Sequence, residues 1–302
     1  MTYASGGLIE ATDYNGFVSS VNAIWGVGSG DSGYGQATTL SSVSAAGTVT
    51  ATQWSDLIAR LNSIRQHSDN TTSGLTAPSA GDTITYLSTL SSQISTANSN
   101  RLNNTGDGNA ANGAGGTLTV SNATGWTTTR TLEISITFSS YNQMRYFFNT
   151  GGYVEISAVN STFSGNTKST DWETLVNNFG TTRIRAQTSS KQGGSGTLST
   201  NNTNAGFWDL TASDTLVLRQ YSPTSTGGYN SNYISSFARL NVAHASSPTI
   251  IYLKIVMQDD AADIVDDTVS GTARIDVAGY ASGVTYISNT WGAFNGTVTV
   301  SG

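Results

Sequence analysis

One stretch of sequence near the N-terminus occurs twice and decides the first part of the fold. Residues 7–24 are GLIEATDYNGFVSSVNAI, and residues 47–64 are GTVTATQWSDLIARLNSI. A shift of 40 residues superimposes five identical pairs, which start from Gly7, Ala11, Thr12, Asn22 and Ile24. In both copies the apolar residues recur with the i, i+3, i+4, i+7 spacing of a helix that buries one side. We therefore predict two amphipathic helices, each of which opens with a threonine suited to N-capping.

A weaker third copy follows the second. Leu87, Leu90, Ile94 and Ala97 have similar spacing after a Gly-Asp-Thr sequence at residues 81–83. Three amphipathic helices make a small bundle, which we assign to residues 1–103 as a docking domain.

The composition changes near residue 104. Residues 104–116 are rich in Gly, Asn and Ala without periodicity, which is typical of a flexible linker. Beyond it, residues 117–302 contain about ten alternating or β-branched stretches and two short helical ones after Ser140 and Thr170. We predict an antiparallel β-sandwich or jelly roll there, so that the fold class is α+β. The predicted strands are 117–121, 131–138, 153–159, 182–188, 215–221, 233–243, 249–258, 269–277, 284–287 and 297–300.

Composition excludes several classes of protein. The 302 residues include no cysteine, so no disulfide or cysteine-based metal site is expected. Only 11% are charged, with a net charge of −6, and the 13 basic residues form no stripe for nucleic acid. The most apolar stretch, residues 250–257, is too short to span a bilayer and contains Lys254. The first residues lack a basic region followed by an apolar one, so we expect no secretory signal.

Residues 28–33, GSGDSG, match the dinucleotide-binding pattern literally. That pattern needs a strand before it and a helix immediately after it, because the pyrophosphate binds the free N–H groups of the helix. Here a predicted helix ends at Trp25 and no helical pattern follows. We interpret these residues as a Gly-rich connection instead.

Catalytic groupings are not apparent. His67 and His244 lie 177 positions apart, without the spacing of a metal pair or of a triad. Spacing pairs none of the glutamates as a glycosidase would require. We therefore predict a protein that is not an enzyme and needs no cofactor. The glutamates are Glu10, Glu133, Glu155 and Glu173.

One acidic cluster can hold calcium, which prefers six to eight oxygen ligands. It lies in a predicted loop between two strands but lacks the glycine and glutamate of an EF-hand loop. The alternative is a solvated turn whose charges keep a strand edge from associating. The cluster consists of Asp259, Asp260, Asp263, Asp266 and Asp267.

Four aromatic residues are candidates for a binding surface. Trp208, Tyr221, Tyr229 and Tyr233 lie among Gly and Ser residues and can serve as interface or carbohydrate-stacking side chains. The alternative is that they are core residues, which we expect for two of the four.

Two stretches resemble a known class of protein. Residues 6–15, GGLIEATDYN, with 24–28 and 33–36, resemble the opening of virion structural proteins from tailed bacteriophages, notably marine cyanophages. Residues 138–140 and 145–153, the latter RYFFNTGGY, are similar to a segment that recurs in the same kind of protein. The resemblance implies a non-enzymatic, symmetric oligomer of the tail, neck or fibres, assembled in the host cytoplasm. Its partners would be copies of itself and other virion proteins.

Two further hypotheses stay open. The β domain can instead recognise a glycan receptor on the host surface, or the protein can decorate the capsid. A surface poor in charge and rich in Ser, Thr, Asn and Gly suits contacts between subunits in each case.

Overall fold

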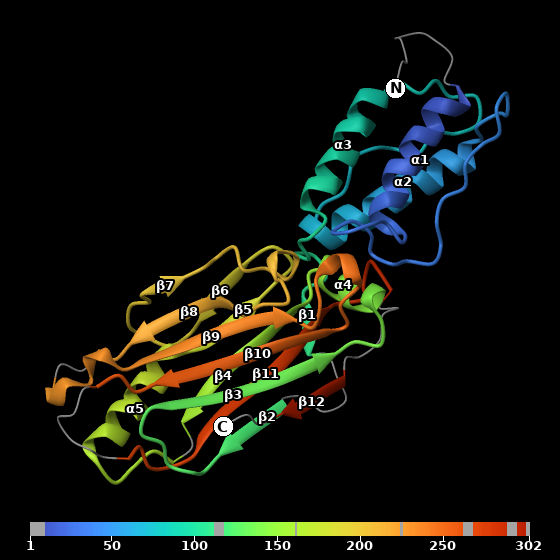
Figure 1. The fold of residues 1–302 in the computed structure, drawn as a ribbon. Coiled ribbons are helices and arrows are strands. Elements are labelled where there is room, and N and C mark those ends of the chain that lie inside the picture. The colour runs from blue at the N-terminus through green and yellow to red at the C-terminus, as the bar shows by residue number, and fades with distance from the viewer. Residues whose placement is uncertain are drawn as a thin grey trace. The chain divides into compact units, whose positions relative to one another are not determined.

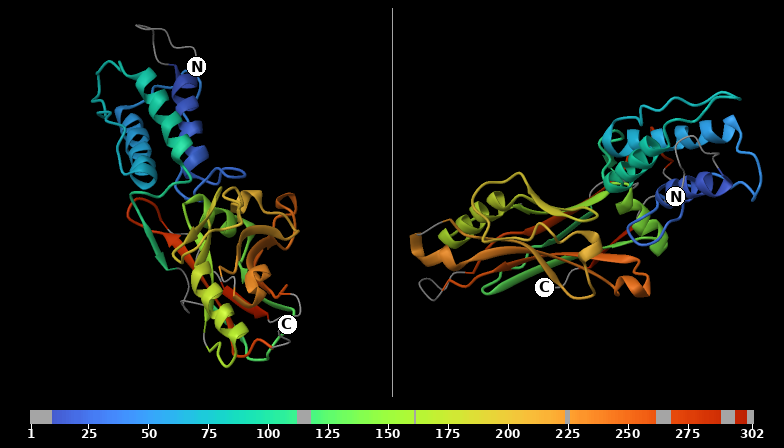
Figure 2. Two further views of the ribbon diagram at one scale, coloured as in Figure 1. Left: turned by 90° about the vertical axis from the view of Figure 1, so that its left-hand side faces the viewer. Right: turned by 90° about the horizontal axis from the view of Figure 1, so that it is seen from above.

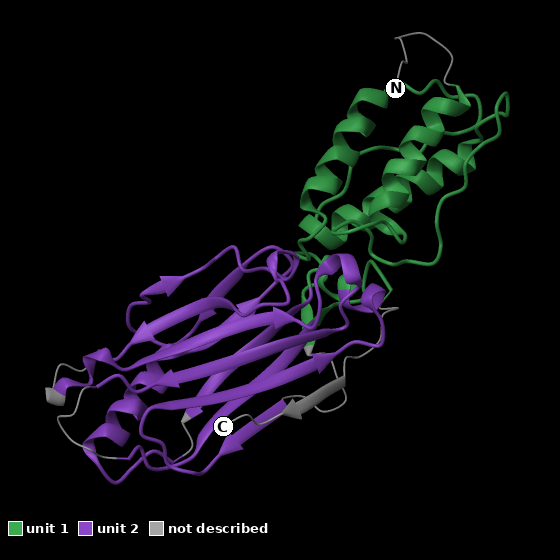
Figure 3. Cartoon of the chain, viewed as in Figure 1, with its two compact units in different colours: residues 1–110, 145–151, 281–292 green, residues 111–144, 152–280, 293–302 purple. Residues whose placement is uncertain are grey.

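The structure is a computed structural model that describes residues 10–111, 118–160, 162–223, 226–261, 268–288 and 295–299. Over these residues the chain is α+β, with five α-helices and two antiparallel sheets (Figure 1). It divides into two compact units (Figure 3). Unit 1 comprises residues 1–110, 145–151 and 281–292, and unit 2 comprises residues 111–144, 152–280 and 293–302.

The internal repeat is a repeat of structure. Helices α1 (Ala11–Trp25) and α2 (Ala51–Asp69) begin 40 residues apart, and α3 (Leu87–Asn100) follows them. The three helices contact one another. Each buries the apolar residues that its spacing predicted: Tyr14, Phe17, Val18, Val21 and Ile24 in α1, Trp54, Leu57, Ile58, Leu61 and Ile64 in α2, and Leu87, Leu90, Ile94 and Ala97 in α3.

The predicted capping threonine is present in α2 but not in α1. The residue before α2 is Thr50, whose hydroxyl accepts a hydrogen bond from the backbone N–H of Gln53 at 3.2 Å. Thr52 already lies inside the helix. In α1 the corresponding position is Glu10, whose N–H donates to the carboxylate of Asp13. The capping residue must have extended backbone and reach the first free N–H groups, and Thr50 and Glu10 meet both requirements.

Asparagines of the repeat fix the segments that follow the helices. Asn22 of α1 donates from its amide to the carbonyl of Leu40 at 2.8 Å and accepts from the Leu40 N–H at 2.9 Å. Asn15 binds both backbone groups of Val43 in the same way. In α2, Asn62 accepts from the N–H of Ser73 at 2.8 Å. Asn22 and Asn62, which are equivalent in the two copies, therefore both bind the backbone of the segment that follows their helix.

The Gly-rich connection is a turn whose carbonyls are bound by α4 (Tyr141–Asn149). Arg145 donates to the carbonyl oxygens of Val27 and Ser32, and Asn149 donates to that of Gly33. Gly28, Gly30, Gly33 and Gly35 all have positive φ. No helix begins again until Ala51, so this loop has neither the strand nor the helix that a dinucleotide site requires.

The first residues of the predicted flexible linker, 104–110, are held in place by hydrogen bonds. Asp107 accepts hydrogen bonds from the backbone N–H of Thr285 and from Nδ1 of His67, both at 2.7 Å. Strand β1 (Asn109–Ala111) follows. Residues 104–110 therefore belong to unit 1, held by side-chain bonds that leave no periodic pattern in the sequence. The predicted strand 284–287 is wrong. The backbone N–H groups of Thr285 and Tyr286 donate to the Asp107 carboxylate and not to a neighbouring strand.

Unit 2 is built on two sheets. Within unit 2, one has the order β11 (Ala273–Ser282), β4 (Tyr153–Asn160), β5 (Thr181–Ile184) and β6 (Ser189–Gln192), with β2 (Leu118–Asn122) also paired to β11. The other has the order β12 (Asn295–Thr299), β3 (Thr129–Thr137), β10 (Ile250–Gln258), β9 (Tyr233–Leu240), β8 (Thr215–Tyr221) and β7 (Thr200–Asn201).

The inward residues of both sheets share one core. Strand β10 alternates strictly, with Ile251, Leu253, Ile255 and Met257 fully buried. Thr182 of β5 donates to Ser236 of β9 at 2.8 Å, which joins the inner sides of the two sheets. Helix α5 (Thr167–Phe179) contacts β4 of one sheet and β8 and β9 of the other (Figure 2).

Helix α5 begins before Thr170, the residue after which the sequence predicted it. Its N-cap is Asn166, whose side chain accepts from the N–H of Ser169 at 2.7 Å, so Thr170 lies inside the helix. Strands β6 and β7 were not predicted, because they are short and polar. Among the described residues, no helix has the length and apolar character that crossing a membrane requires.

Candidate binding surface

The outward side of the β3 sheet carries aromatic and cationic side chains. Residues that face each other across neighbouring strands point to the same side of a sheet, and the register therefore defines this surface. Tyr221 faces Tyr233, Phe237 faces Lys254, and Arg239 faces Tyr252. We call this surface the aromatic face. It consists of Arg219, Tyr221, Tyr233, Phe237, Arg239, Tyr252 and Lys254.

One end of the aromatic face is a tyrosine pair with an arginine. The rings of Tyr221 and Tyr233 have centroids 5.3 Å apart, and the Arg219 guanidinium lies 4.3 Å from the centroid of Tyr233. Nε of Arg219 donates to the hydroxyl of Ser235 at 2.9 Å. Tyr221 is 41% exposed, the most exposed large aromatic side chain that the structure describes. Arg219 makes no salt bridge within the described residues, so its charge is available to a partner.

The other end is balanced in charge. Arg239 pairs with Glu133 at 3.1 Å and with Asp214 at 3.3 Å, and Lys254 also pairs with Asp214. The Arg239 guanidinium lies 3.7 Å from the ring centroid of Tyr252, and the Lys254 ammonium lies 5.0 Å from that of Phe237. Two cations and two carboxylates therefore neutralise each other. The excess positive charge of the aromatic face is at Arg219.

The four predicted aromatic residues divide between surface and interior. Tyr221 and Tyr233 meet on the aromatic face, whereas Tyr229 is 2% exposed and lies in the core. Trp208 is half-buried and stacks on His244, with ring centroids 4.9 Å apart and planes at 28°. The structure therefore unites only two of the four in one surface.

Both histidines are held by structural contacts. His67 is fully buried near the end of α2 and pairs with Asp107. Nε2 of His244 lies 3.0 Å from the carbonyl of Phe207, and burial lowers the pKa of His244. A neutral His244 donates that hydrogen bond and packs between rings.

The acidic cluster is described only in part. Asp259 is buried and pairs with the ammonium of Lys168 at 2.8 Å, and Asp260 accepts from the side chain of Gln258. Asp263, Asp266 and Asp267 lie outside the described residues. Within the described ranges, no three His, Asp or Glu residues are grouped to hold a metal ion. Calcium at this loop stays a prediction that Asp259 does not favour, because its carboxylate already has a cation.

Sequence reasoning missed most of the aromatic face. Arg219 and Tyr252 lie in predicted strands, but the half-exposed position of Tyr252 between two buried neighbours is seen only in the structure. Phe237 also lies in a predicted strand, where it follows three successive buried residues, Ile234–Ser236. Only the register with β8 and β10 places Phe237 and Lys254 side by side.

Comparisons of this chain with protein-family models, with curated proteins and with solved structures give no match.

Proposed function

We propose that this chain is a structural component of a tailed-phage virion and that the aromatic face is one of its contacts with a neighbouring subunit. In the finer architecture that we propose, α1–α3 are a docking bundle and unit 2 is a jelly-roll-like β-sandwich. The protein acts by assembly, as a tail, neck or fibre protein, and carries out no reaction.

The tyrosine pair with Arg219 is the observation that carries this proposal. Interface residues that dominate binding energy are mainly Trp, Tyr and Arg, clustered so that they lose water on binding. Tyr221, Tyr233 and Arg219 have these identities, and Arg219 holds one ring in place. Rings that are already positioned lose little conformational entropy when a partner binds.

The resemblance has its own support in unit 1. The two stretches that carry it are in contact, because Arg145 and Asn149 of the second bind carbonyls of the Gly-rich loop of the first. The ring of Tyr146 lies against Gly35, where an added Cβ would come within 2.4 Å. Residues that pack on each other are expected to recur together in proteins of one kind.

A second candidate function is recognition of a host-surface glycan. Half-exposed tyrosine rings on a sheet are also stacking surfaces for sugar rings, and Arg219 can donate to sugar hydroxyls. This alternative uses the same side chains but a different partner.

A complementation experiment in the phage that encodes this chain separates the two. The phage lacking the gene is supplied with the wild-type chain or with Tyr221→Ser, Arg219→Ser or Val284→Ser. Val284 is an exposed apolar residue outside the aromatic face and serves as the matched control. We expect the first two variants to lower the copy number of the chain in purified particles about tenfold or more, measured by quantitative mass spectrometry.

Each other outcome has a clear meaning. Normal incorporation with lost adsorption to host cells would favour glycan recognition over assembly. Absence of the wild-type chain from purified particles would overturn the virion proposal altogether. Normal incorporation and normal adsorption of both variants would remove the aromatic face from either role.

A further inference from the structure

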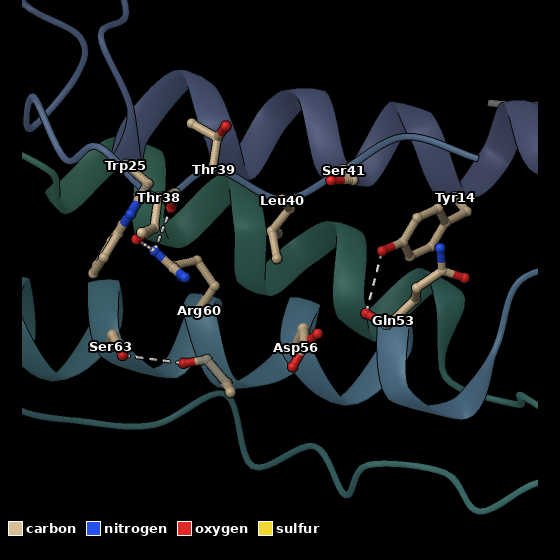
Figure 4. A pocket seen from close by; sticks show the side chains of 11 residues that line it. Tyr14, Trp25, Thr38, Thr39, Leu40, Ser41, Gln53, Asp56, Arg60 and Ser63 are labelled. Atoms are coloured by element: carbon tan, nitrogen blue, oxygen red, sulfur yellow. Dashed lines mark hydrogen bonds between the residues drawn. The ribbon is translucent and has the colours of Figure 1, made fainter. Parts of the chain in front are cut away.

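Neighbouring opposite charges in this chain differ in how much water reaches them. In a groove of about 700 Å³ lined by α2 and residues 38–41, half-buried Arg60 and exposed Asp56 lie one helical turn apart and act on each other (Figure 4). Water reaches both of these charges. Lys168 and Asp259 of unit 2 are the opposite case, because their side chains are only 6% and 1% exposed.

Two secondary-structure elements hold the side chains of this buried pair in contact. Nζ of Lys168 lies 2.8 Å from Oδ2 of Asp259. Lys168 is the second residue of α5, whose start is fixed by Asn166 accepting from the N–H of Ser169 at 2.7 Å. Asp259 directly follows β10, and its N–H donates to the carbonyl of Thr128 at 2.7 Å. The two reactive groups are therefore positioned by the fold.

Burial makes the charged form of this pair costly. An ammonium has three N–H donors, and among the described residues Asp259 is the only acceptor that Nζ of Lys168 has. Two ions taken out of water are well stabilised only if further hydrogen bonds satisfy them. An amide between the two side chains carries no charge, so its formation removes this cost.

Hydrogen-bond donors lie beside the other oxygen of Asp259. Its Oδ1 accepts from the N–H of Ala261 at 3.4 Å, and the same N–H donates to Oδ1 of Asn232 at 2.9 Å. The side chain of Asn232 is therefore close to the carboxylate. Asn232 is fully buried, and its Nδ2 has no hydrogen-bond acceptor among the described residues. Donors so placed stabilise an oxygen on which negative charge develops when its carbon is attacked.

We propose that Lys168 and Asp259 join in an intramolecular amide (isopeptide) bond. The ammonium of Lys168 gives one proton to Oδ2 of Asp259 through their hydrogen bond, and the lone pair of the resulting amine attacks Cγ. The Nζ–Cγ bond forms, the Cγ–Oδ2 bond breaks, and Oδ2 leaves as water with that proton and a second one from Nζ. No atom is oxidised or reduced, and no other reactant is consumed.

Proximity and burial favour this condensation. Groups held about 3–3.5 Å apart in a suitable orientation react as if present at about 10⁵–10⁸ M. A buried site also excludes the water that hydrolyses such a bond. The bond links two positions 91 residues apart in a chain without cysteine, and it restricts the unfolded chain as a disulfide does. It lies within unit 2 and does not depend on the proposed function.

Mass spectrometry of the purified full-length chain tests the bond. We expect the intact wild-type protein to be lighter than its sequence requires by the mass of one water molecule. Lys168→Ala and Asp259→Ala should have their full calculated masses. In a tryptic digest of the wild type, cleavage after Lys168 should be lost, and the peptide of residues 146–183 should be joined to that of residues 255–274.

The same digest contains a matched control. Lys254 and Asp214 also pair, but their side chains are 18% and 37% exposed, so they should stay unlinked and trypsin should cleave after Lys254. The proposal is overturned if the intact wild-type mass equals that of the sequence or if cleavage after Lys168 is complete. Loss of one water without the joined peptides, as cyclisation of an aspartate produces, also overturns it. The wild-type digest decides even if both alanine variants fail to fold.

Discussion

At the scale of single residues, Asp107 organises a buried polar site that joins three parts of unit 1. Its carboxylate accepts hydrogen bonds from His67 of α2 and from the backbone of Thr285 and Tyr286. Burial alone would raise the pKa of Asp107, but the hydrogen bond and charge of His67 and the N–H of Thr285 outweigh it, so that the pKa is lowered. The folded state therefore favours the ionised carboxylate.

We predict that Asp107→Asn lowers the free energy of unfolding by about 2–4 kcal/mol at pH 7, because the amide leaves buried donors without a suitable acceptor. A lowered folded-state pKa stabilises the protein above the unfolded value of about 3.9, and this stabilisation disappears as the pH falls through the folded-state pKa. The difference between wild type and variant should therefore shrink from pH 5 to pH 3. Urea unfolding at both pH values measures it.

Asp56→Asn is the control for this prediction. Asp56 is exposed and accepts no hydrogen bond in the described part of the chain, so its replacement should change the free energy of unfolding by less than about 0.5 kcal/mol. An Asp107→Asn protein as stable as the control variant would show that the buried site is not stabilising. An equal difference at both pH values would show that ionisation of Asp107 is not its source.

At the scale of secondary-structure elements, the sequence predicted those elements that carry a periodic apolar pattern. The apolar spacing of α1, α2 and α3 identified both element type and buried side, since the pattern reports one packed surface, and the apolar, β-branched composition of residues 249–258 identified a strand. Elements fixed by backbone bonding to side chains had no such signal. The partly β-branched residues 284–287 predict a strand, whereas the N–H groups of Thr285 and Tyr286 bind Asp107.

The Gly-rich connection between α1 and the segment 38–41 permits a prediction at this scale. Gly35 has φ +69°, and an added Cβ would lie 2.4 Å from the ring of Tyr146. Gly30 has φ +56° with nothing within 4 Å of an added Cβ. We expect Gly30→Ala to cost about 1–2 kcal/mol from backbone strain alone, and Gly35→Ala to cost about 1–3 kcal/mol more from the clash.

Urea unfolding of the two variants isolates the packing of α4 on this loop, because both carry the same substitution at a positive φ. Equal losses of stability would mean that the Tyr146 ring moves away without cost. In that case the contact between the loop and α4 would contribute little to unit 1.

At the scale of the whole molecule, the sequence predicted the order of helical and β regions but not the composition of unit 1. The change in composition predicts a boundary at residue 104. A change of this kind carries information on residues adjacent in sequence and none on which distant segments pack together. Unit 1 also includes residues 145–151 and 281–292, which lie far away in sequence. The aromatic face was predictable only in part. Tyr221 and Tyr233 are aromatic residues in predicted strands, but the pairing of β8 with β9 that brings them together is a tertiary contact that the sequence pattern does not contain.

The discontinuity of unit 1 leads to a prediction about fragments. A fragment of residues 1–103 keeps α1, α2 and α3 but lacks three sets of partners. Asp107, which binds His67, is absent, and so are Arg145 and Asn149, which bind the loop carbonyls. Gln36, 3% exposed, loses both of its hydrogen bonds to the backbone of Ser288.

Because these losses leave buried polar groups unsatisfied, we expect the fragment to keep helical far-ultraviolet circular dichroism without fixed tertiary packing. Its amide spectrum should be poorly dispersed, and its amides should exchange with solvent within minutes. The same amides of α1 and α2 should be protected in the full chain, which is the matched control for hydrogen exchange. A fragment of residues 1–103 that unfolds cooperatively with a dispersed spectrum would show that the helices fold without the later segments. The distant residues 145–151 and 281–292 would then be additions to a self-sufficient bundle, and the boundary near residue 104 would be the correct one after all.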